Sequence, residues 1–347
     1  MDRIREHVAD VVGENIDALL HIDLKGCGVP LELYRAARAQ AQGPVVMNAA
    51  RKLQQRVQPG DSVLLVTGFI SPPWYRAEHD GLAGTAILAR ALEMTLSAIP
   101  VVVVEQELKN TMERLLRNVG LVVYDEYDSV VGKGCTGWVV GFPVGRLEVD
   151  RASQRLLGLC QPKAIIAIER PGPNCDGRYH FVSGEEIVKC ISEMEIPFEM
   201  MKEAGYLTIG IGDNGNELGL GSIADVTRTV HRASHIATSI AADAVVTASV
   251  ADWGAFGLAA ALAFLAQRKD ALACSSVLER LIWASIDSGI IDGSRGYAVT
   301  RIDDIELDFH VLLLDMLHHL LIYGESATSK YRTRIEWYVE RIRSGSS

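Results

Sequence analysis

Short runs of branched apolar residues alternate with longer segments of helical spacing along the middle of the chain. Such runs are typical of strands that are buried on both faces, as in a parallel sheet. They lie at residues 62–68, 101–104, 121–124, 162–169, 206–211 and 244–250. Because strand and helix alternate as in βαβ units, the pattern predicts an α/β fold. We expect a mainly parallel sheet flanked by helices, a Rossmann-like body of three layers.

The two ends of the chain have helical spacing without the alternation of strands. Residues 1–58 predict a helical N-terminal segment, and the α/β body is expected to span residues 59–300. Residues 301–347 predict C-terminal helices packed on the body, at 309–322 and at 329–342. The apolar positions of these C-terminal helices would suit a homodimer.

Some segments of the body give weaker patterns. Residues 132–150 are rich in glycine and are left without an assignment, whereas residues 185–192 and most of 223–241 are predicted to be helical. The most apolar segment, residues 254–266, is shorter than the roughly 20 residues that a membrane-spanning helix needs. We therefore expect it to be a buried helix and expect no membrane association.

Composition narrows the class of protein. The chain has 347 residues, 48% of them hydrophobic and 22% charged, which excludes a disordered protein. A net charge of -10 argues against a nucleic-acid partner. Residues 1–7 are too polar to begin a secretory signal, so a cytoplasmic location is expected.

Residues 210–221 combine five glycines with four side chains that carry oxygen ligands. Glycine lets the backbone approach a ligand closely. Asp213 and Glu217 are hard oxygen donors that suit Mg²⁺, Mn²⁺ or Ca²⁺. The alternative is an ordinary loop, since glycine, asparagine and aspartate are also common turn residues.

The same loop formally matches a dinucleotide-binding fingerprint at Gly210, Gly212 and Gly215. That fingerprint requires a helix to begin within it. Further glycines at 219 and 221 disfavour a helix by about 1 kcal/mol each relative to alanine. The motif therefore argues only weakly for a nucleotide.

Acidic residues follow four of the predicted strands. The loops after parallel strands share one edge of the sheet, where ligands bind. These acids are Glu78, Asp80, Glu169, Asp176, Asp213, Glu217 and Asp252. Several carboxylates in one cleft would repel each other, and a divalent cation, Mn²⁺ or Mg²⁺, relieves that repulsion.

Each acid also has a plain structural alternative. Asp80 precedes a predicted helix and is a candidate cap, and Asp176 precedes a glycine in a candidate turn. Glu169 is a candidate ion-pair partner of Arg170 or Arg178. Both interpretations remain open for any single acid.

Several short motifs follow or precede the predicted strands. They are Thr67-Gly68-Phe69, His79-Asp80-Gly81, Ala167-Ile168-Glu169-Arg170-Pro171-Gly172, Asp176-Gly177-Arg178-Tyr179, Gly212-Asp213-Asn214-Gly215-Asn216-Glu217-Leu218-Gly219 and Ser249-Val250-Ala251-Asp252-Trp253-Gly254-Ala255. Together these motifs resemble the D-glutamate cyclase family. The similarity is to the C-terminal module of mitochondrial D-glutamate cyclases and to its stand-alone prokaryotic relatives, over about residues 45–300. The resemblance implies a metal-binding α/β domain and an activity that interconverts D-glutamate and 5-oxo-D-proline.

The leading hypothesis is therefore a metal-dependent enzyme, a lyase, acting on a small carboxylated substrate. We expect the metal to be held by a subset of four acids: Asp80, Glu169, Asp213 and Glu217. Substrate contacts are expected from Thr67, Gly68, Arg170, Arg178 and Gly212. The arginines suit a carboxylate because guanidinium binds it through two hydrogen bonds. Asn216 would orient the reacting group and Asp176 would carry the proton.

Two other classes of function fit the same residues. One is a metal-dependent hydrolase, such as a phosphatase, that uses the same acids. The other is a nonenzymatic sensor of a metabolite or nucleotide, in which the glycine-rich loop grips a phosphate.

Overall fold

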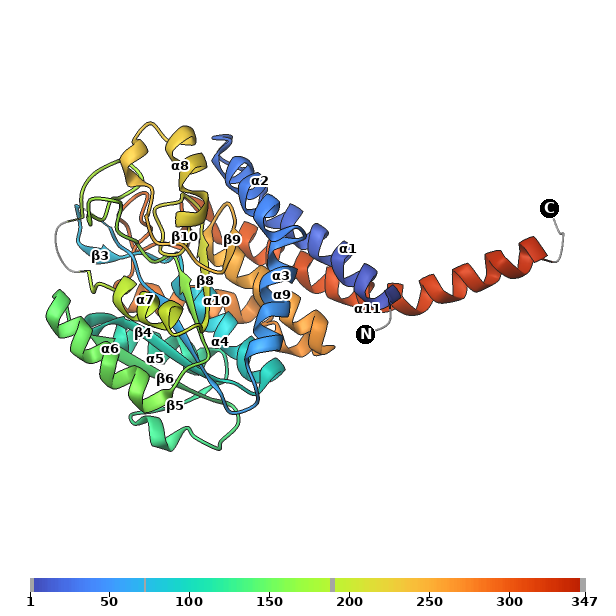
Figure 1. Cartoon of the computed structure of the whole chain (residues 1–347), viewed down its shortest axis with the longest axis horizontal. Helices are drawn as coiled ribbons and strands as arrows, with labels where there is room; N and C mark the ends of the chain where they lie inside the picture. Colours follow the sequence, from blue (N-terminus) through green and yellow to red (C-terminus); the bar gives the residue numbers. More distant parts are fainter. Residues whose placement is uncertain (1–2, 72, 188–190, 344–347) are drawn as a thin grey trace.

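The centre of the protein is a sheet of seven strands in the order β5-β6-β4-β1-β7-β8-β9, with every neighbouring pair parallel (Figure 1). This computed structural model describes residues 3–71, 73–187 and 191–343. The strands are β1 (Ser62–Thr67), β4 (Ile99–Glu105), β5 (Val122–Tyr124), β6 (Thr136–Phe142), β7 (Ala164–Ile168), β8 (Leu207–Gly212) and β9 (Ala244–Thr247). The predicted α/β fold with a parallel sheet is confirmed.

The side chains of the central strands point alternately to the two faces of the sheet. In β1, Val63 and Leu65 belong to one buried cluster, and Leu64 and Val66 belong to another. Because both faces are covered, the middle of each central strand is an apolar run without the alternation of polar positions seen in half-exposed strands. This double burial explains why the runs are visible in the sequence.

Helices cover both faces and complete three layers. Figure 1 shows α6 and α7 on one side of the sheet and α3 and α9 on the other. The first face carries α6 (Arg146–Cys160) and α7 (Glu195–Glu203). The second face carries α1 (Arg3–Leu20), α2 (Val29–Ala41), α3 (Val45–Arg56), α4 (Leu82–Leu96), α5 (Lys109–Asn118), α9 (Ala251–Ala266), α10 (Ser275–Asp287) and the start of α11 (Leu307–Arg343).

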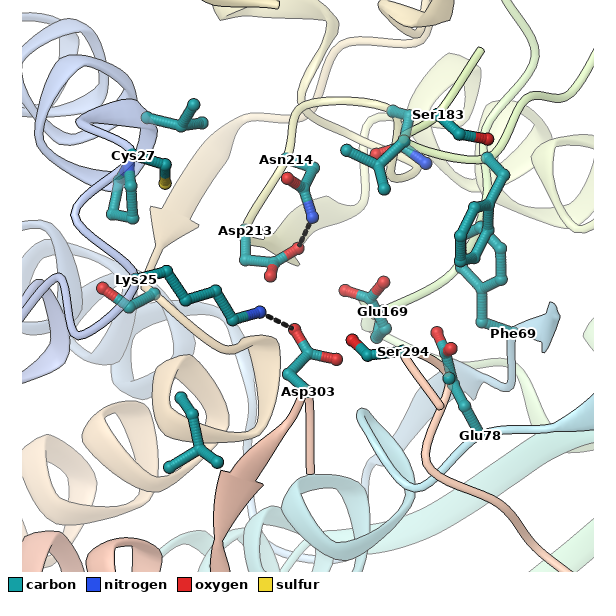
Figure 2. A pocket seen from close by; sticks show the side chains of 18 of the residues that line it. Lys25, Cys27, Phe69, Glu78, Glu169, Ser183, Asp213, Asn214, Ser294 and Asp303 are labelled. Carbon is teal, nitrogen blue, oxygen red and sulfur yellow. Dashed lines mark hydrogen bonds and ion pairs between the residues drawn. The ribbon is translucent and has the colours of Figure 1, made fainter. Parts of the chain in front are cut away.

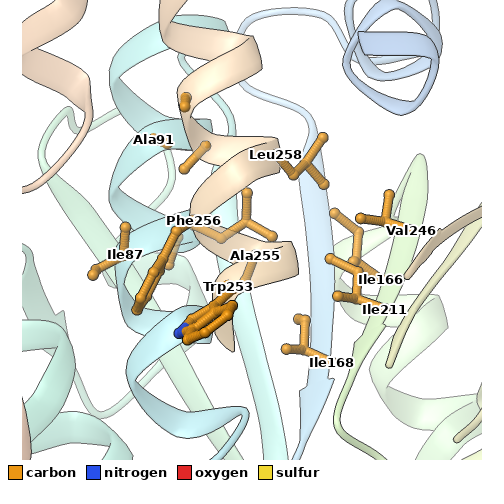
Figure 3. Packing of buried hydrophobic residues seen from close by; sticks show 14 of the residues in the cluster. Ile87, Ala91, Ile166, Ile168, Ile211, Val246, Trp253, Ala255, Phe256 and Leu258 are labelled. Carbon is orange, nitrogen blue, oxygen red and sulfur yellow. The ribbon is translucent and has the colours of Figure 1, made fainter. Parts of the chain in front are cut away.

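Helix α9 is the core of the second layer. Every residue from Ala251 to Phe264 is buried. Figure 3 shows Phe256 beside Ile87 of α4, while Leu258 lies toward the strand residues Ile166 and Val246. The apolar segment at 254–266 is therefore a buried helix, as predicted.

Three local predictions within the body need correction. Residues 136–142, which were left unassigned, form β6 in the interior of the sheet. The described part of the predicted helix at 185–192 is not helical; instead the N–H of Phe181 donates to the carbonyl oxygen of Glu185, and the N–H of Ile187 donates to that of Tyr179. In residues 223–241, the helical parts are the last residue of the 3₁₀ turn Gly221–Ile223, α8 (Ala224–Val230) and the 3₁₀ turn Ser234–Ile236.

The C-terminal segment also differs from its prediction. It begins with a hairpin, β10 (Arg301–Ile302) and β11 (Ile305–Glu306), whose two turn residues have positive φ. One helix, α11, then replaces the two helices expected. Its first part packs against α1, α9 and α10, and its second part extends away from the body (Figure 1).

Among the described residues, Leu307–Ser326 of α11 is the single stretch long and apolar enough to cross a membrane by length and composition. Core helices pass the same test, and 39% of its most apolar window is buried within the protein. Leu314, Leu317 and Leu321 are fully buried against the core. Part of this apolarity therefore serves to hold α11 on the body.

The strand order creates a crevice between β1 and β7. The chain leaves β1 toward β4 on one side of the sheet and leaves β7 toward β8 on the other side. Loops that diverge in this way open a space at the carboxyl ends of the two strands, where α/β proteins bind ligands. The fold therefore places the loops that begin at Gly68 and Glu169 at the expected position of a site.

Candidate functional site

A cavity of about 400 Å³ lies at the carboxyl ends of the central strands. Four strand-following loops contribute to it, through Phe69, Glu169, Asp213 and Ser249. The connection between α1 and α2 and the β10–β11 hairpin close the remaining sides. The volume is within the roughly 300–1,000 Å³ of small-molecule sites.

Carboxylates gather at one wall of this cavity. Glu169, Asp213 and Glu217 each offer an oxygen within 4.8 Å of the others, and so do Asp80, Asp213 and Asp303. Asp213 belongs to both groups. Figure 2 shows Asp213, Glu169 and Asp303 directed at a common space. This wall of the cavity is therefore acidic, and it is called the acidic wall below.

Glu169 and Asp213 of this cluster hold their protons more tightly than free carboxylic acids do. Burial raises the pKa of Glu169 well above its ordinary value, and the neighbouring Asp213 and Glu217 charges raise it further. Burial likewise raises the pKa of Asp213, with additional effects from Asp303 and Glu217. Ionising the whole cluster therefore requires a compensating positive charge.

Glu217 organises the turn that presents Asp213. Its carboxylate accepts hydrogen bonds from the backbone N–H groups of Asn214 at 2.9 Å and Gly215 at 2.7 Å, and from that of Asp213 at 3.3 Å. Gly212 leaves room for this carboxylate, because a Cβ there would lie 2.6 Å from Glu217 Cδ. Gly212 thus supports the turn and does not line the cavity.

Asp80 has a similar supporting position. It accepts hydrogen bonds from the backbone N–H groups of Gly81 at 2.9 Å, Ala251 at 2.9 Å and Asp252 at 2.7 Å. The last two belong to the first turn of α9, so Asp80 caps that helix. Asp80 lies within reach of Asp213 and Asp303 but behind the cavity wall.

Glu169 is held in a strained conformation. It follows β7 directly, and its φ of 41° lies in the left-handed region that non-glycine residues avoid. Its side chain is 5% exposed, and its Oε2 has no hydrogen-bond partner among the described residues. Strain and an unpaired buried oxygen at one residue are typical of functional sites.

Arg170, one of the predicted substrate-binding residues, is buried and does not line the cavity. Its guanidinium is fully buried and pairs with Glu105 at 2.6 Å. It also donates to the carbonyl oxygens of Gly68 at 2.8 Å, Ser192 at 2.6 Å and Thr67 at 3.3 Å. Thr67 and Gly68 thus fix Arg170 below the cavity and do not line it.

Arg178 and Asp176 also lie outside the cavity lining. Arg178 is exposed and pairs with Glu186 at 3.4 Å. Asp176 is in a solvent-exposed turn whose backbone bonds to the side chain of Asn174. The structure therefore brings the predicted metal ligands Glu169 and Asp213 together with the predicted catalytic residue Asn216 at the cavity. It places Arg178 and Asp176 away from them.

A family model described as D-glutamate cyclase-like, C-terminal, matches residues 18–320 of the chain. The chain belongs to this D-glutamate cyclase-like family. The resemblance found in the short motifs is thereby confirmed, and it extends well beyond residues 45–300. Membership supports a function as an enzyme related to D-glutamate cyclase.

The chain is also similar to a human protein named D-glutamate cyclase, mitochondrial. The two are 30% identical over 214 residues, which is 59% of this chain and 33% of the human protein. The chain therefore corresponds to about a third of the length of its human relative.

Two cavity residues of this family member were missed in the sequence. Lys25 lies in the α1–α2 connection, and Asp303 lies at the tip of the β10–β11 hairpin. The pair Asp303-Asp304 between two isoleucines is a recognisable signal of a tight turn. Lys25 has no comparable signal, because a single lysine in a polar connection is commonplace.

Proposed function

We propose that this protein is a metal-dependent enzyme that interconverts D-glutamate and 5-oxo-D-proline, or that acts on a closely related carboxylated substrate. The observation that carries the proposal is the convergence of Glu169, Asp213 and Asp303 on one cavity in a D-glutamate cyclase-like chain. The family supports the class of reaction, and the carboxylates support the metal.

The donor set fits a hard divalent cation. Carboxylate oxygens suit Mn²⁺ and Mg²⁺, and the unpartnered Oε2 of Glu169 is available as a ligand. Asp213, Glu169 and Asp303, which line the cavity, would hold the ion, while Glu217 accepts a hydrogen bond from the backbone N–H of Asp213 behind them. When bound, the cation would act as a Lewis acid toward the γ-carboxyl group or the lactam carbonyl.

Asn216 is suited to orient the nitrogen of the substrate. Its Nδ2 donates to the carbonyl oxygen of His180 at 3.0 Å, which fixes the side-chain amide. Its Oδ1 is buried and has no partner among the described residues. This oxygen would accept a hydrogen bond from the amine of D-glutamate or the lactam N–H of 5-oxo-D-proline.

Glu78 replaces Asp176 as the proposed proton carrier, because Glu78 lines the cavity. Burial, together with the charge of Asp303, raises the pKa of Glu78 to about 8. The hydroxyl of Ser71 donates to its Oε2 at 2.6 Å. In ring closure the neutral amine nitrogen bonds to the carbon of the γ-carboxyl group, Glu78 protonates the departing hydroxyl of that group to give water, and the proton lost by the nitrogen returns to Glu78.

The direct test is an assay of the purified chain with D-glutamate and with 5-oxo-D-proline. Conversion should require added Mn²⁺ or Mg²⁺ and should cease with a chelator, and the L-isomers serve as controls. A panel of phosphate esters tests the hydrolase alternative in parallel. Turnover of esters without turnover of D-glutamate or 5-oxo-D-proline would contradict the proposal.

A further inference from the structure

Lys25 is the one lysine or arginine among the described residues that line the cavity. Its Nζ lies 3.3 Å from Asp303 Oδ2. Figure 2 shows the lysine reaching from the α1–α2 connection into the space beneath Asp213. A cationic group therefore already occupies part of the acidic wall.

The connection that carries Lys25 is braced by its own residues. Asp23 accepts a hydrogen bond from the backbone N–H of Gly28 at 2.6 Å, across the base of the connection. Gly28 has a φ of 76°, which glycine adopts without strain. The backbone is thus held, whereas the Lys25 side chain is 45% exposed and has a flexible four-carbon stem.

Lys25 and a divalent cation would compete for Asp303. Asp303 is one of the three acids grouped with Asp213 and Asp80, and it also holds the ammonium group of Lys25. Because the ammonium group of Lys25 lies 3.3 Å from Asp303 Oδ2, an ion that binds Asp303 would meet a positive charge already in place. Two positive charges on one carboxylate repel each other, so an ion at Asp303 would displace the ammonium group.

The displaced ammonium group would lose its 3.3 Å ion pair with Asp303 while it still reaches into the cavity. A substrate that carries a carboxylate would supply a new partner for it. The two arginines expected to bind it do not line the cavity, since Arg170 is buried with Glu105 and Arg178 pairs with Glu186 at the surface. Among the described residues that line the cavity, Lys25 is therefore the basic group positioned to bind a substrate carboxylate.

We propose that Lys25 binds the substrate carboxylate, after a divalent cation has taken its place on Asp303. This inference rests on the proposed metal dependence, and it assigns the substrate-binding group that the predicted arginines do not supply. It implies an order of binding in which the cation comes first and the dicarboxylate second.

The test uses Lys25→Met, Lys25→Arg and the matched control Lys52→Met. Lys52 is remote from the cavity lining and bonds to the carbonyl oxygen of Asp243 at 2.7 Å. Calorimetry measures Mn²⁺ binding to each metal-free protein. It then measures binding of glutarate, a nonreacting dicarboxylate, with and without saturating Mn²⁺.

Lys25→Met should bind Mn²⁺ at least as tightly as the parent, because the competing charge is gone. Its affinity for glutarate in the presence of Mn²⁺ should fall about tenfold or more, as expected for loss of a charged hydrogen bond. Lys25→Arg should retain most of the glutarate affinity, and Lys52→Met should match the parent in both measurements. In the parent, glutarate should bind much more weakly without Mn²⁺.

Two results would overturn the inference. One is unchanged glutarate binding by Lys25→Met. The other is weaker Mn²⁺ binding by the same variant, because Lys25 would then only hold Asp303 in place. If melting temperatures show that Lys25→Met is misfolded, the Mn²⁺ and glutarate binding of Lys25→Arg is used to decide instead. A parent that binds Mn²⁺ and glutarate without converting D-glutamate would leave this inference standing and contradict only the proposed reaction.

Discussion

Asp80 and Asp252 cap each other's helices. Asp80 lies just before α4 and accepts from the N–H groups of Ala251 and Asp252 at the start of α9. Asp252 Oδ1 in turn accepts from the N–H group of Gly84 in the first turn of α4, at 2.6 Å. Each carboxylate thus lies at the positive N-terminal end of the other residue's helix, directly behind the acidic wall of the cavity.

This arrangement predicts that Asp80 contributes chiefly to stability. Asp80→Ala leaves three buried N–H groups without their acceptor, so the free energy of unfolding should fall by about 1–3 kcal/mol. Urea denaturation of the metal-free protein measures this loss. The exposed Asp270 provides the control, since Asp270→Ala should change stability by less than about 0.5 kcal/mol.

Asp213 should instead contribute chiefly to metal binding. It belongs to both groups of carboxylates, so Asp213→Asn removes a ligand charge while keeping the size of the side chain. We expect Mn²⁺ affinity in calorimetry to fall by more than the roughly 10- to 100-fold typical of losing a residue behind the ligands. The loss of Mn²⁺ affinity in Asp80→Ala should fall within that smaller range of roughly 10- to 100-fold. Equal losses in the two variants would contradict the division between them.

The acidic wall also predicts how stability depends on pH without metal. Burial raises the pKa of Glu78 from 4.5 to about 8 and that of Asp252 from 3.8 to about 7. The folded protein therefore keeps protons that the unfolded chain has released, and stability falls as pH rises toward 8. Buried His21, His79 and His310, whose pKa values are lowered to about 4, act in the opposite direction only below about pH 6.5.

The measurement is the melting temperature between pH 6.5 and pH 8. With a chelator present, the melting temperature should fall across this interval, and Glu78→Gln should flatten the trend. Saturating Mn²⁺ should reduce or reverse it, because the ion binds ionised carboxylates and its affinity rises with pH. A chelated protein that is more stable at pH 8 than at pH 6.5 would exclude this account.

The sheet could be predicted because its strands are buried on both faces and form apolar runs. Strand β6 was missed because Gly137 and Gly141 interrupt its run. A Cβ at Gly141 would lie 3.0 Å from the backbone Cα of Gln106, so close packing with the segment after β4 disfavours a larger residue there. That requirement is tertiary and cannot be detected from the periodicity of the strand itself.

The site residues also divide into those that local sequence predicts and those that depend on tertiary packing. Glu169, Asp213 and Asn216 follow sheet strands, so their common position follows from the parallel order of the sheet. Lys25 and Asp303 belong to segments outside the sheet, at opposite ends of the chain. Their meeting at 3.3 Å depends on how α1 and α11 pack together, which local sequence does not specify.

The close contact of α4 and α9 predicts a cost for enlarging Gly84. A Cβ at this position would lie 2.6 Å from Asp252 Oδ1 and 2.8 Å from Ala255 Cβ. Gly84→Ala should therefore destabilise the protein by about 1–3 kcal/mol in urea denaturation. Gly158→Ala in α6 is the matched control, because nothing lies within 4 Å of its added Cβ. This control should gain about 0.5–1 kcal/mol from helix propensity.

Glu169 offers a test of whether backbone strain is retained for function. Its φ of 41° is unfavourable for any residue with a Cβ, by roughly 1–2 kcal/mol, whereas glycine adopts this conformation readily. Glu169→Gly and Glu169→Ala both remove the carboxylate, so both should lose Mn²⁺ binding in calorimetry. Only the glycine variant also relieves the strain, and it should unfold at higher urea concentration than the alanine variant. Equal stability of the two variants, or Mn²⁺ binding retained by either, would show that the strained glutamate is not held there for the metal.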